Sequence, residues 1–201
     1  MNIVQKDIER KLNKVKKGQL LFLADFRGFG SEAAIKMALS RLVKQEKVNR
    51  IAHGIYLVPK SDPVLGLIFP SMEQIAEAIA KRDHVKIKPA GAYALHKLGL
   101  TTQVPTRLVY LTNGAPREIK IGKTSIKFKA TTSKKFALRG KLSSLIIQAL
   151  EEINPANIDP EMKQRIKELL AKEDPKKLGY DIKLAPARIS DFLYELLKES
   201  K

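Results

Sequence analysis

The sequence contains no cysteine and no tryptophan, and aromatic residues make up only 6% of its 201 residues. The absence of cysteine excludes disulfides, thiolate metal sites, iron–sulfur clusters and a cysteine nucleophile. It is also compatible with a reducing compartment. The scarcity of aromatic side chains argues against a base-stacking platform for RNA.

Long apolar segments are also missing. The longest apolar stretch, Val64–Phe69, is interrupted by Gly66, and it is far shorter than the roughly 18 residues that a membrane span needs. Residues 1–8 become polar and charged at once, without the apolar region of a signal peptide. We therefore expect a cytoplasmic protein.

Acidic residues are scarce relative to basic ones: 38 Lys and Arg against 21 Asp and Glu give a formal charge of +17. Such an excess favours polyanionic partners, either nucleic acid or an anionic membrane. Residues 1–60 carry 13 basic and 5 acidic side chains, and so do residues 61–138, whereas residues 139–201 carry 12 and 11. No single basic amphipathic helix with bulky apolar anchors is present, which disfavours membrane-surface binding.

The remaining composition, 44% hydrophobic and 29% charged, is that of an ordinary globular protein. A chain of this length suits two small domains. Proline at positions 59 and 63 makes Ser61–Pro63 the best candidate hinge. We therefore expect a first domain over residues 1–60 and a second over residues 64–201.

Apolar spacing in the first domain predicts helix, short helix or turn, amphipathic basic helix and β-hairpin, in that order. Ser31 is the expected N-cap of the amphipathic helix. This is the order of a winged helix-turn-helix. The expected segments are a helix over 3–15, an apolar run over 20–23, a helix over 31–45, and strands over 48–51 and 55–58 joined at Ala52–Gly54.

The second domain is expected to be α+β with a helical C-terminal end. Asn113-Gly114 and Gly122-Lys123 are turn signals that separate its strands. The expected helices cover 71–81 and 91–98, followed by strands over 107–111, 117–121 and 125–129, and by helices over 141–153, 159–172 and 186–199.

The second helix of a helix-turn-helix enters the major groove, where long polar side chains contact base edges and phosphates. The alternative is an amphipathic helix whose polar face is merely solvated, with Arg41 in an internal ion pair. Tyr56 is expected to pack against the first helix. The DNA-contact candidates are Ser31, Lys36, Met37, Ser40, Arg41 and Lys44 on the helix, and Arg50 and His53 in the wing.

Basic residues recur in the second domain without an acidic counterweight, and alternation places basic and apolar groups on opposite faces of one hairpin. Such a surface could extend a DNA footprint, bind an acidic protein or bind RNA. The candidate partner-binding residues are Lys97, Arg107, Arg117, Lys120, Lys127 and Lys129.

The sequence contains no complete catalytic motif, and we expect no enzyme activity, no cofactor and no metal site. Gly122-Lys123-Thr124 is not the end of a P-loop, because Arg117 stands where the earlier glycine is required. Gly30-Ser31 is not followed by the Asp-x-Asp or Asp-x-Glu pair that would hold metal ions in a nucleotidyltransferase. The three histidines are too scattered to form a metal site or a catalytic triad.

Two groups of residues resemble AbiEi-type antitoxins, the transcription-factor halves of AbiE toxin–antitoxin systems. In the first domain they are Asp25-Phe26, Gly30-Ser31, Ala38–Leu42 and Arg50–Pro59. In the second they are Gly91–Leu95, Leu98–Leu100, Val104-Pro105 and Tyr110–Gly114.

This resemblance implies a two-domain protein that represses its own operon through the N-terminal winged helix, bound to double-stranded promoter DNA. It also implies that the C-terminal domain neutralises a nucleotidyltransferase-like toxin. The competing hypothesis is a protein-interaction module whose basic second domain binds an acidic partner, with DNA binding secondary. The oligomeric state does not follow from the sequence.

Overall fold

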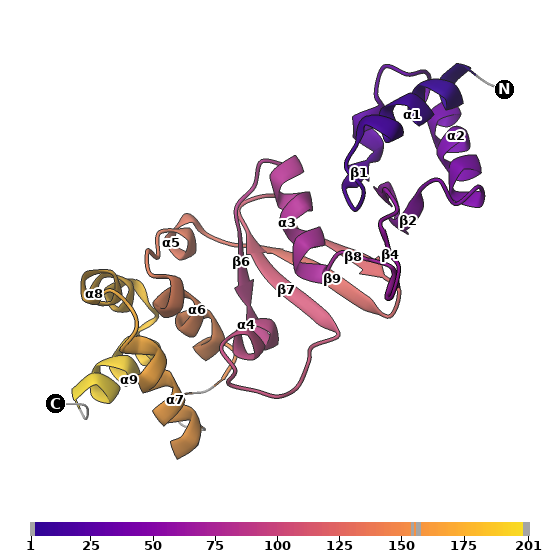
Figure 1. Ribbon diagram of the computed structural model, residues 1–201. Helices are drawn as coiled ribbons and strands as arrows, with labels where there is room; N and C mark the ends of the chain where they lie inside the picture. The colour runs from indigo at the N-terminus through magenta and orange to yellow at the C-terminus, as the bar shows by residue number, and fades with distance from the viewer. Residues whose placement is uncertain (1–2, 154, 156–157, 199–201) are drawn as a thin grey trace. The chain divides into compact units, whose positions relative to one another are not determined.

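The first 60 residues form the elements that the apolar periodicity predicts, in the predicted order (Figure 1). The computed structural model describes residues 3–153, 155 and 158–198. Its N-terminal elements are α1 (Ile3–Lys14), β1 (Leu20–Phe22), the 3-10 helix η1 (Leu23–Phe26), α2 (Glu32–Lys44), β2 (Asn49–Ala52) and β3 (Ile55–Leu57). This is the winged helix-turn-helix order, with a single 3-10 turn as the first helix of the pair.

The wing is part of a three-stranded antiparallel sheet in the order β1-β3-β2. Leu21 and Arg50 both pair with Tyr56, so β3 is the central strand. The turn between β2 and β3 contains Gly54, whose φ of +70° lies in the region that favours glycine. The predicted tight hairpin is therefore confirmed.

The core of this segment lies between α1, α2 and the sheet. Ile8 of α1 and Leu39 and Leu42 of α2 are fully buried, and burial of each such side chain stabilises the fold by about 1.5–3 kcal/mol. Tyr56 belongs to the same cluster and is 6% exposed, which confirms that it packs inward. Phe26 of η1 is also fully buried and joins the helix-turn-helix to this core.

The expected hinge forms a small hairpin of its own, β4 (Ser61–Asp62) and β5 (Gly66–Leu67). The Asp62 carboxylate accepts hydrogen bonds from the backbone N–H groups of Val64 (2.8 Å) and Leu65 (3.0 Å), which closes the turn. Helix α3 (Met72–Arg82) follows. Ser71 caps it, because its hydroxyl accepts the Gln74 N–H (3.1 Å) while the Gln74 side chain accepts the Ser71 N–H (2.9 Å).

The chain divides into two compact units, Met1–Ile79 (unit 1) and Ala80–Lys201 (unit 2). This division falls within α3, later in the chain than the predicted hinge. Compactness alone does not decide which segments fold independently, so the boundary at residues 61–63 stays a prediction.

Unit 2 contains a mixed four-stranded sheet in the order β6-β7-β9-β8. Its strands are β6 (Ile87–Ala90), β7 (Arg107–Thr112), β8 (Arg117–Ile121) and β9 (Thr124–Ala130). Strand β6 was not predicted, because it contains Pro89, which is tolerated at the edge of a sheet but not in a central strand. The turn at Gly122 joins β8 and β9 as a hairpin, whereas Asn113-Gly114 does not, because β7 pairs with β9 in parallel.

After the sheet, the structure contains two helices that the sequence pattern did not predict, the short α5 and α8. Asp174 caps α8 by accepting the Lys177 N–H (3.0 Å), and Pro175 starts it rather than ending structure. The helices of unit 2 are α4 (Gly91–Lys97), α5 (Ser133–Phe136), α6 (Lys141–Leu150), α7 (Pro160–Leu170), α8 (Pro175–Leu184) and α9 (Ala187–Lys198) (Figure 1).

Two carboxylates from distant parts of the chain cap the N-terminus of α6. Fully buried Asp181 accepts the N–H groups of Arg139 (2.7 Å) and Gly140 (2.8 Å) and the Ser143 hydroxyl (2.6 Å). Glu173 accepts the N–H groups of Leu142 (2.6 Å) and Ser143 (3.1 Å). These bonds satisfy donors that a helix N-terminus otherwise leaves unpaired, and they fix α8 and the turn before it against α6.

A half-buried lysine fastens the other side of α6 to the sheet. The Lys88 ammonium on β6 donates to the carbonyls of Lys135 (3.2 Å) and Leu138 (3.0 Å) and to the Ser144 hydroxyl (3.0 Å). Burial lowers the pKa of Lys88, because it disfavours the charged form. The sheet, α5 and α6 are thus held by one side chain.

We expect Asp181→Asn to destabilise unit 2 by on the order of 3 kcal/mol, because the neutral amide turns a donor toward groups that need a charged acceptor. Calorimetric melting measures this loss. Asp191→Asn, on the exposed face of α9, is the matched control and should change stability by less than about 0.5 kcal/mol. Equal effects of the two variants would contradict the capping role.

The Glu173 cap predicts a pH dependence. Burial opposes its ionisation, but the N–H groups of Ser143, Leu142 and Asp174 outweigh burial, so its pKa lies below the ordinary 4.5. Because the folded pKa is the lower one, the stabilisation is complete above the unfolded pKa and is lost as the pH falls below it. Glu173→Gln should lower the melting temperature at pH 7 and flatten its fall below pH 4.5, whereas Glu195→Gln should do neither.

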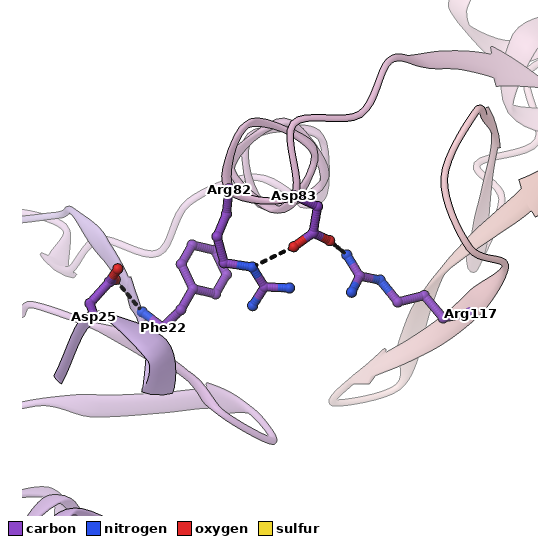
Figure 2. Close-up of polar contacts among 5 residues, drawn as sticks. All are labelled: Phe22, Asp25, Arg82, Asp83 and Arg117. Carbon is purple, nitrogen blue, oxygen red and sulfur yellow. Dashed lines mark hydrogen bonds and ion pairs between the residues drawn. The ribbon is translucent and has the colours of Figure 1, made fainter. Parts of the chain in front are cut away.

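Arg117 is bound within unit 2 beside the sheet. Its guanidinium forms an ion pair with Asp83, which also accepts from Arg82 Nε at 2.7 Å (Figure 2). Arg117 also lies over the Phe128 ring, 5.4 Å from its centroid. Burial opposes ionisation of Asp83, but Arg82 and Arg117 outweigh it and lower its pKa.

We therefore expect Arg117→Gln to destabilise unit 2 by about 1 kcal/mol, after allowance for solvent screening of a partly exposed pair. Lys127→Gln, on an exposed position of the neighbouring strand, should have less than half that effect. Urea unfolding followed by circular dichroism compares the two proteins, and indistinguishable midpoints would show that the pair contributes nothing.

Candidate nucleic-acid interface

All eight predicted DNA-contact residues are exposed, and all lie on α2 or on the wing. Ser31 caps α2, because its hydroxyl accepts the Ala34 N–H at 3.3 Å. The apolar residues of α2 face the core, so its small, polar and basic face is left to solvent. A helix whose polar face is merely solvated would show the same exposure, so exposure alone does not distinguish it from a helix that contacts DNA.

Four of the eight residues come together around one cleft. Lys36 and Ser40 of α2 and Arg50 and His53 of the wing line a cavity of about 210 Å³. Leu23, Val43, Gly54 and Tyr56 complete its walls. The cleft therefore joins the exposed face of α2 to the wing, whereas Ser31, Met37, Arg41 and Lys44 do not line it.

Contacts from α1 and β1 fix the turn that precedes α2. Lys11 donates to the Asp25 carbonyl and lies over the rings of Phe26 (5.4 Å) and Phe29 (5.6 Å). The Asp25 carboxylate accepts the Phe22 N–H at 2.7 Å (Figure 2). Because these contacts position the short helix η1, they also set the direction in which α2 leaves the core.

Short-range contacts hold several of the candidate side chains. Lys36 pairs with Glu32 one turn earlier at 2.5 Å, and the hydrogen bond from Lys36 lowers the pKa of Glu32. In the wing, Arg50 Nη2 lies 3.1 Å from His53 Nδ1. Both contacts are exposed, so the side chains remain free to exchange them for phosphate or base contacts.

Among the described residues, Arg41 has no carboxylate partner for the internal ion pair that the sequence left open. Its guanidinium instead lies 3.4 Å from the Met37 sulfur, on the exposed face of α2. Arg27 was not predicted. It is exposed in the turn before α2 and lines a second cavity of about 160 Å³ with Gly28, Gly30 and Glu32. Its place directly before Gly28, in the glycine-containing turn that leads to the Ser31 N-cap, is the signal that could have identified it.

The strand register of unit 2 separates the predicted partner-binding residues. Arg107, Lys127 and Lys129 share one sheet face with Lys120. We call these four residues the basic sheet face. Arg117 pairs with Phe128 and lies on the opposite face, and Lys97 lies on α4, 5.9 Å from the centroid of the Tyr93 ring.

The expectation that these basic residues lack an acidic counterweight was wrong. Glu118 forms an ion pair with Arg107 at 3.2 Å and accepts the Ser125 hydroxyl at 2.8 Å. The Ser125 hydrogen bond, together with Arg107 and nearby lysines, lowers the pKa of Glu118. The sequence did not indicate that Glu118 pairs with Arg107 or Asp83 with Arg117, because the members of each pair are far apart in the chain. Only the folding of the chain into the sheet brings them together.

Within residues 3–153, 155 and 158–198, no group of three or more His, Cys, Asp or Glu side chains could hold a metal ion. None of the helices described is long and apolar enough to cross a membrane.

The fold has a counterpart among solved structures. The crystal structure of the RV2827C protein from Mycobacterium tuberculosis is similar to this chain, with a TM-score of 0.55. The two share 15% sequence identity over 98% of this chain and 77% of that protein. At this identity the likeness establishes the fold alone. No curated protein matches the chain.

Comparison with family models gives a match over most of the sequence. The model described as a family of unknown function, DUF6088, matches residues 7–178. This range includes α2, the wing and the basic sheet face, and it exceeds half of the chain. The chain therefore belongs to the DUF6088 family.

Proposed function

We propose that this protein is a DNA-binding transcriptional regulator that contacts double-stranded DNA through α2 and the wing. The observation that carries the proposal is the cleft at which Lys36 and Ser40 of α2 meet Arg50 and His53 of the wing. These side chains are exposed and belong to a winged helix-turn-helix fold.

The chemistry of this surface suits duplex DNA. A helix presented with its polar face outward fits the major groove, where Ser40 can reach a base edge and Lys36 and Lys44 can reach phosphates. Arg50 and His53, at the end of the wing, suit the adjacent backbone or minor groove. The excess of basic residues in the first 60 positions adds a sequence-independent attraction to the duplex.

The resemblance to AbiEi-type antitoxins makes the proposal more specific. It implies that the bound DNA is the promoter of the protein's own operon and that binding represses transcription. Such a regulator works in the cytoplasm. The AbiEi-like residues of the first domain include Ala38–Leu42 of α2 and Arg50–Pro59 around the wing, the two elements that form the cleft.

Replacing Lys36 and Lys44 together by alanine should weaken binding to the gene's own upstream duplex about 10- to 100-fold, because two phosphate contacts are lost. Fluorescence anisotropy at several salt concentrations measures this. The slope of log K against log salt should become less negative by about 0.9 for each lost phosphate contact. A slope unchanged by the substitutions would contradict the proposed contacts.

A matched control separates contact from charge. Lys172→Ala with Lys176→Ala removes the same charge from exposed positions in the C-terminal helical region. This pair should leave affinity within about twofold, whereas Ser40→Ala should narrow the preference for the upstream duplex over a random one. An equal loss of affinity in the two double variants would mean that only net charge matters. Equal affinity of the unaltered protein for the upstream and random duplexes would exclude a regulator that recognises sequence.

The basic sheet face supports a second function, binding of an acidic protein. Three of its members, Lys120, Lys127 and Lys129, are exposed lysines without an ion-pair partner among the described residues. In the antitoxin proposal this partner is a nucleotidyltransferase-like toxin encoded beside the gene. Arg117 is not part of this surface, because it forms an ion pair with Asp83.

Co-expression with such a neighbouring gene should relieve growth inhibition, and Lys120→Glu with Lys127→Glu should abolish the relief by reversing the charge. The same variant should retain binding to the upstream duplex, because the proposed DNA contacts are made by α2 and the wing. Relief that survives the charge reversal would remove the basic sheet face from the interaction. Absence of relief by the unaltered protein would overturn the antitoxin proposal and leave the regulator proposal standing.

A further inference from the structure

A groove of about 510 Å³ lies in unit 2 where the C-terminal end of α6 meets the sheet. Its sheet side includes Val109 and Leu111 of β7 and Lys129 of β9. Its helix side includes Gln148 of α6 and Glu151 and Glu152 directly after it. The volume is in the range of pockets that hold small molecules.

Ser144 and Gln148 lie on α6, and Glu152 follows directly after it. Because the three residues are four positions apart, they lie in a row along one side of the helix and its continuation. Ser144 accepts from Lys88 of the sheet at 3.0 Å, which shows that this side faces β6. An interface between a helix and a sheet is ordinarily apolar. Polar side chains in such an interface therefore need hydrogen-bond partners, and Ser144 has one in Lys88.

Gln148 is 2% exposed and lines the groove, yet its side-chain nitrogen has no hydrogen-bond partner. Among buried side-chain nitrogens and oxygens in the described part of the chain, it is the one left without a partner. A buried amide donor is costly to leave unpaired. A ligand that presents an oxygen acceptor in the groove would satisfy it.

The charges that line the groove leave two of opposite sign uncompensated. Lys135 forms an ion pair with Glu151, and Arg107 forms one with Glu118. Neither Lys129 nor Glu152 has a side-chain partner among the residues described. The groove therefore offers one free cation and one free carboxylate, with the Gln148 amide as an additional donor.

The backbone sets the distance between these two charges. Glu152 lies beside Gly91 at the end of β6, where a Cβ would come within 3.3 Å of its carboxylate. Lys129 of β9 pairs with Leu111 of β7, which pairs with Lys88 of β6, three residues before Gly91. Two strand spacings amount to about 10 Å, and the offset of three residues along the strands adds about 10 Å at right angles to them, so the two backbone positions lie about 14 Å apart. Two extended residues span about 7 Å, and an ion pair at each end fills the remainder.

We propose that this groove binds a short zwitterion of the dipeptide class. Its ammonium contacts Glu152, its carboxylate contacts Lys129, and its central carbonyl accepts from Gln148. A single amino acid is too short to reach both charges. Every residue that lines this groove belongs to unit 2, so the proposal is independent of DNA binding by α2 and the wing.

Calorimetric titration of the 201-residue chain with the dipeptide alanyl-alanine tests this. N-acetylation of the dipeptide should weaken binding at least about tenfold, and amidation of its carboxylate should do the same, because each removes one ion pair. Glu152→Gln should bind the free and acetylated dipeptides equally. Lys129→Ala should bind the free and amidated dipeptides equally.

Gln148→Leu keeps the size of the side chain and removes the unpaired donor, so it should remain folded and weaken all three dipeptides alike. Circular dichroism melting checks folding of each variant. Lys123→Ala and Glu195→Gln, exposed and away from the groove, should bind as the unaltered protein does. Absence of binding at millimolar dipeptide, or blocked dipeptides that bind as tightly as the free one, would overturn the proposal, as would Gln148→Leu with unchanged affinity.

Discussion

The capping of α6 by Asp181 and Glu173 is the interaction on which unit 2 depends. A helix N-terminus buried beside other elements must find acceptors for its free N–H groups, and here a fully buried carboxylate supplies three hydrogen bonds. The same bonds hold α8 against α6, while Lys88 holds α6 to the sheet from the other side. Removing Asp181 would leave the Gly140 N–H and the Ser143 hydroxyl unpaired in the interior, and removing Glu173 would leave two partly buried N–H groups unpaired.

Unit 1 depends on a different constraint, which is the direction of α2. Buried Phe26, the Asp25 carboxylate and Lys11 fix the turn before this helix. The apolar stripe of α2 then determines which face is buried, and the opposite face is presented together with the wing. The proposed DNA contacts thus follow from packing, since none of the candidate side chains is itself part of the core.

The excess of basic residues has two distinct structural origins. In unit 1 the basic residues lie on α1 and directly after it, as well as on the exposed face of α2 and in the wing. In unit 2 the register of β8 and β9 collects Lys120, Lys127 and Lys129 on one face, while Arg107 and Arg117 pair with Glu118 and Asp83. The charge that is available to a partner is therefore smaller than the formal charge suggests, and it is confined to particular faces.

The sequence by itself determined the order of elements in the first 60 residues, the Ser31 cap and the inward position of Tyr56. Each of these follows from local spacing or from a single turn of backbone. It did not reveal β6 or α8, because a proline inside an edge strand and a proline at a helix start both resemble breaks in regular structure. Only the tertiary structure placed Lys36, Ser40, Arg50 and His53 around one cleft. It also paired Asp83 and Glu118 with their arginines, and it left the Gln148 side-chain nitrogen without a hydrogen-bond partner among the described residues. These outcomes depend on strand register and helix packing, which bring together residues that lie far apart in the chain.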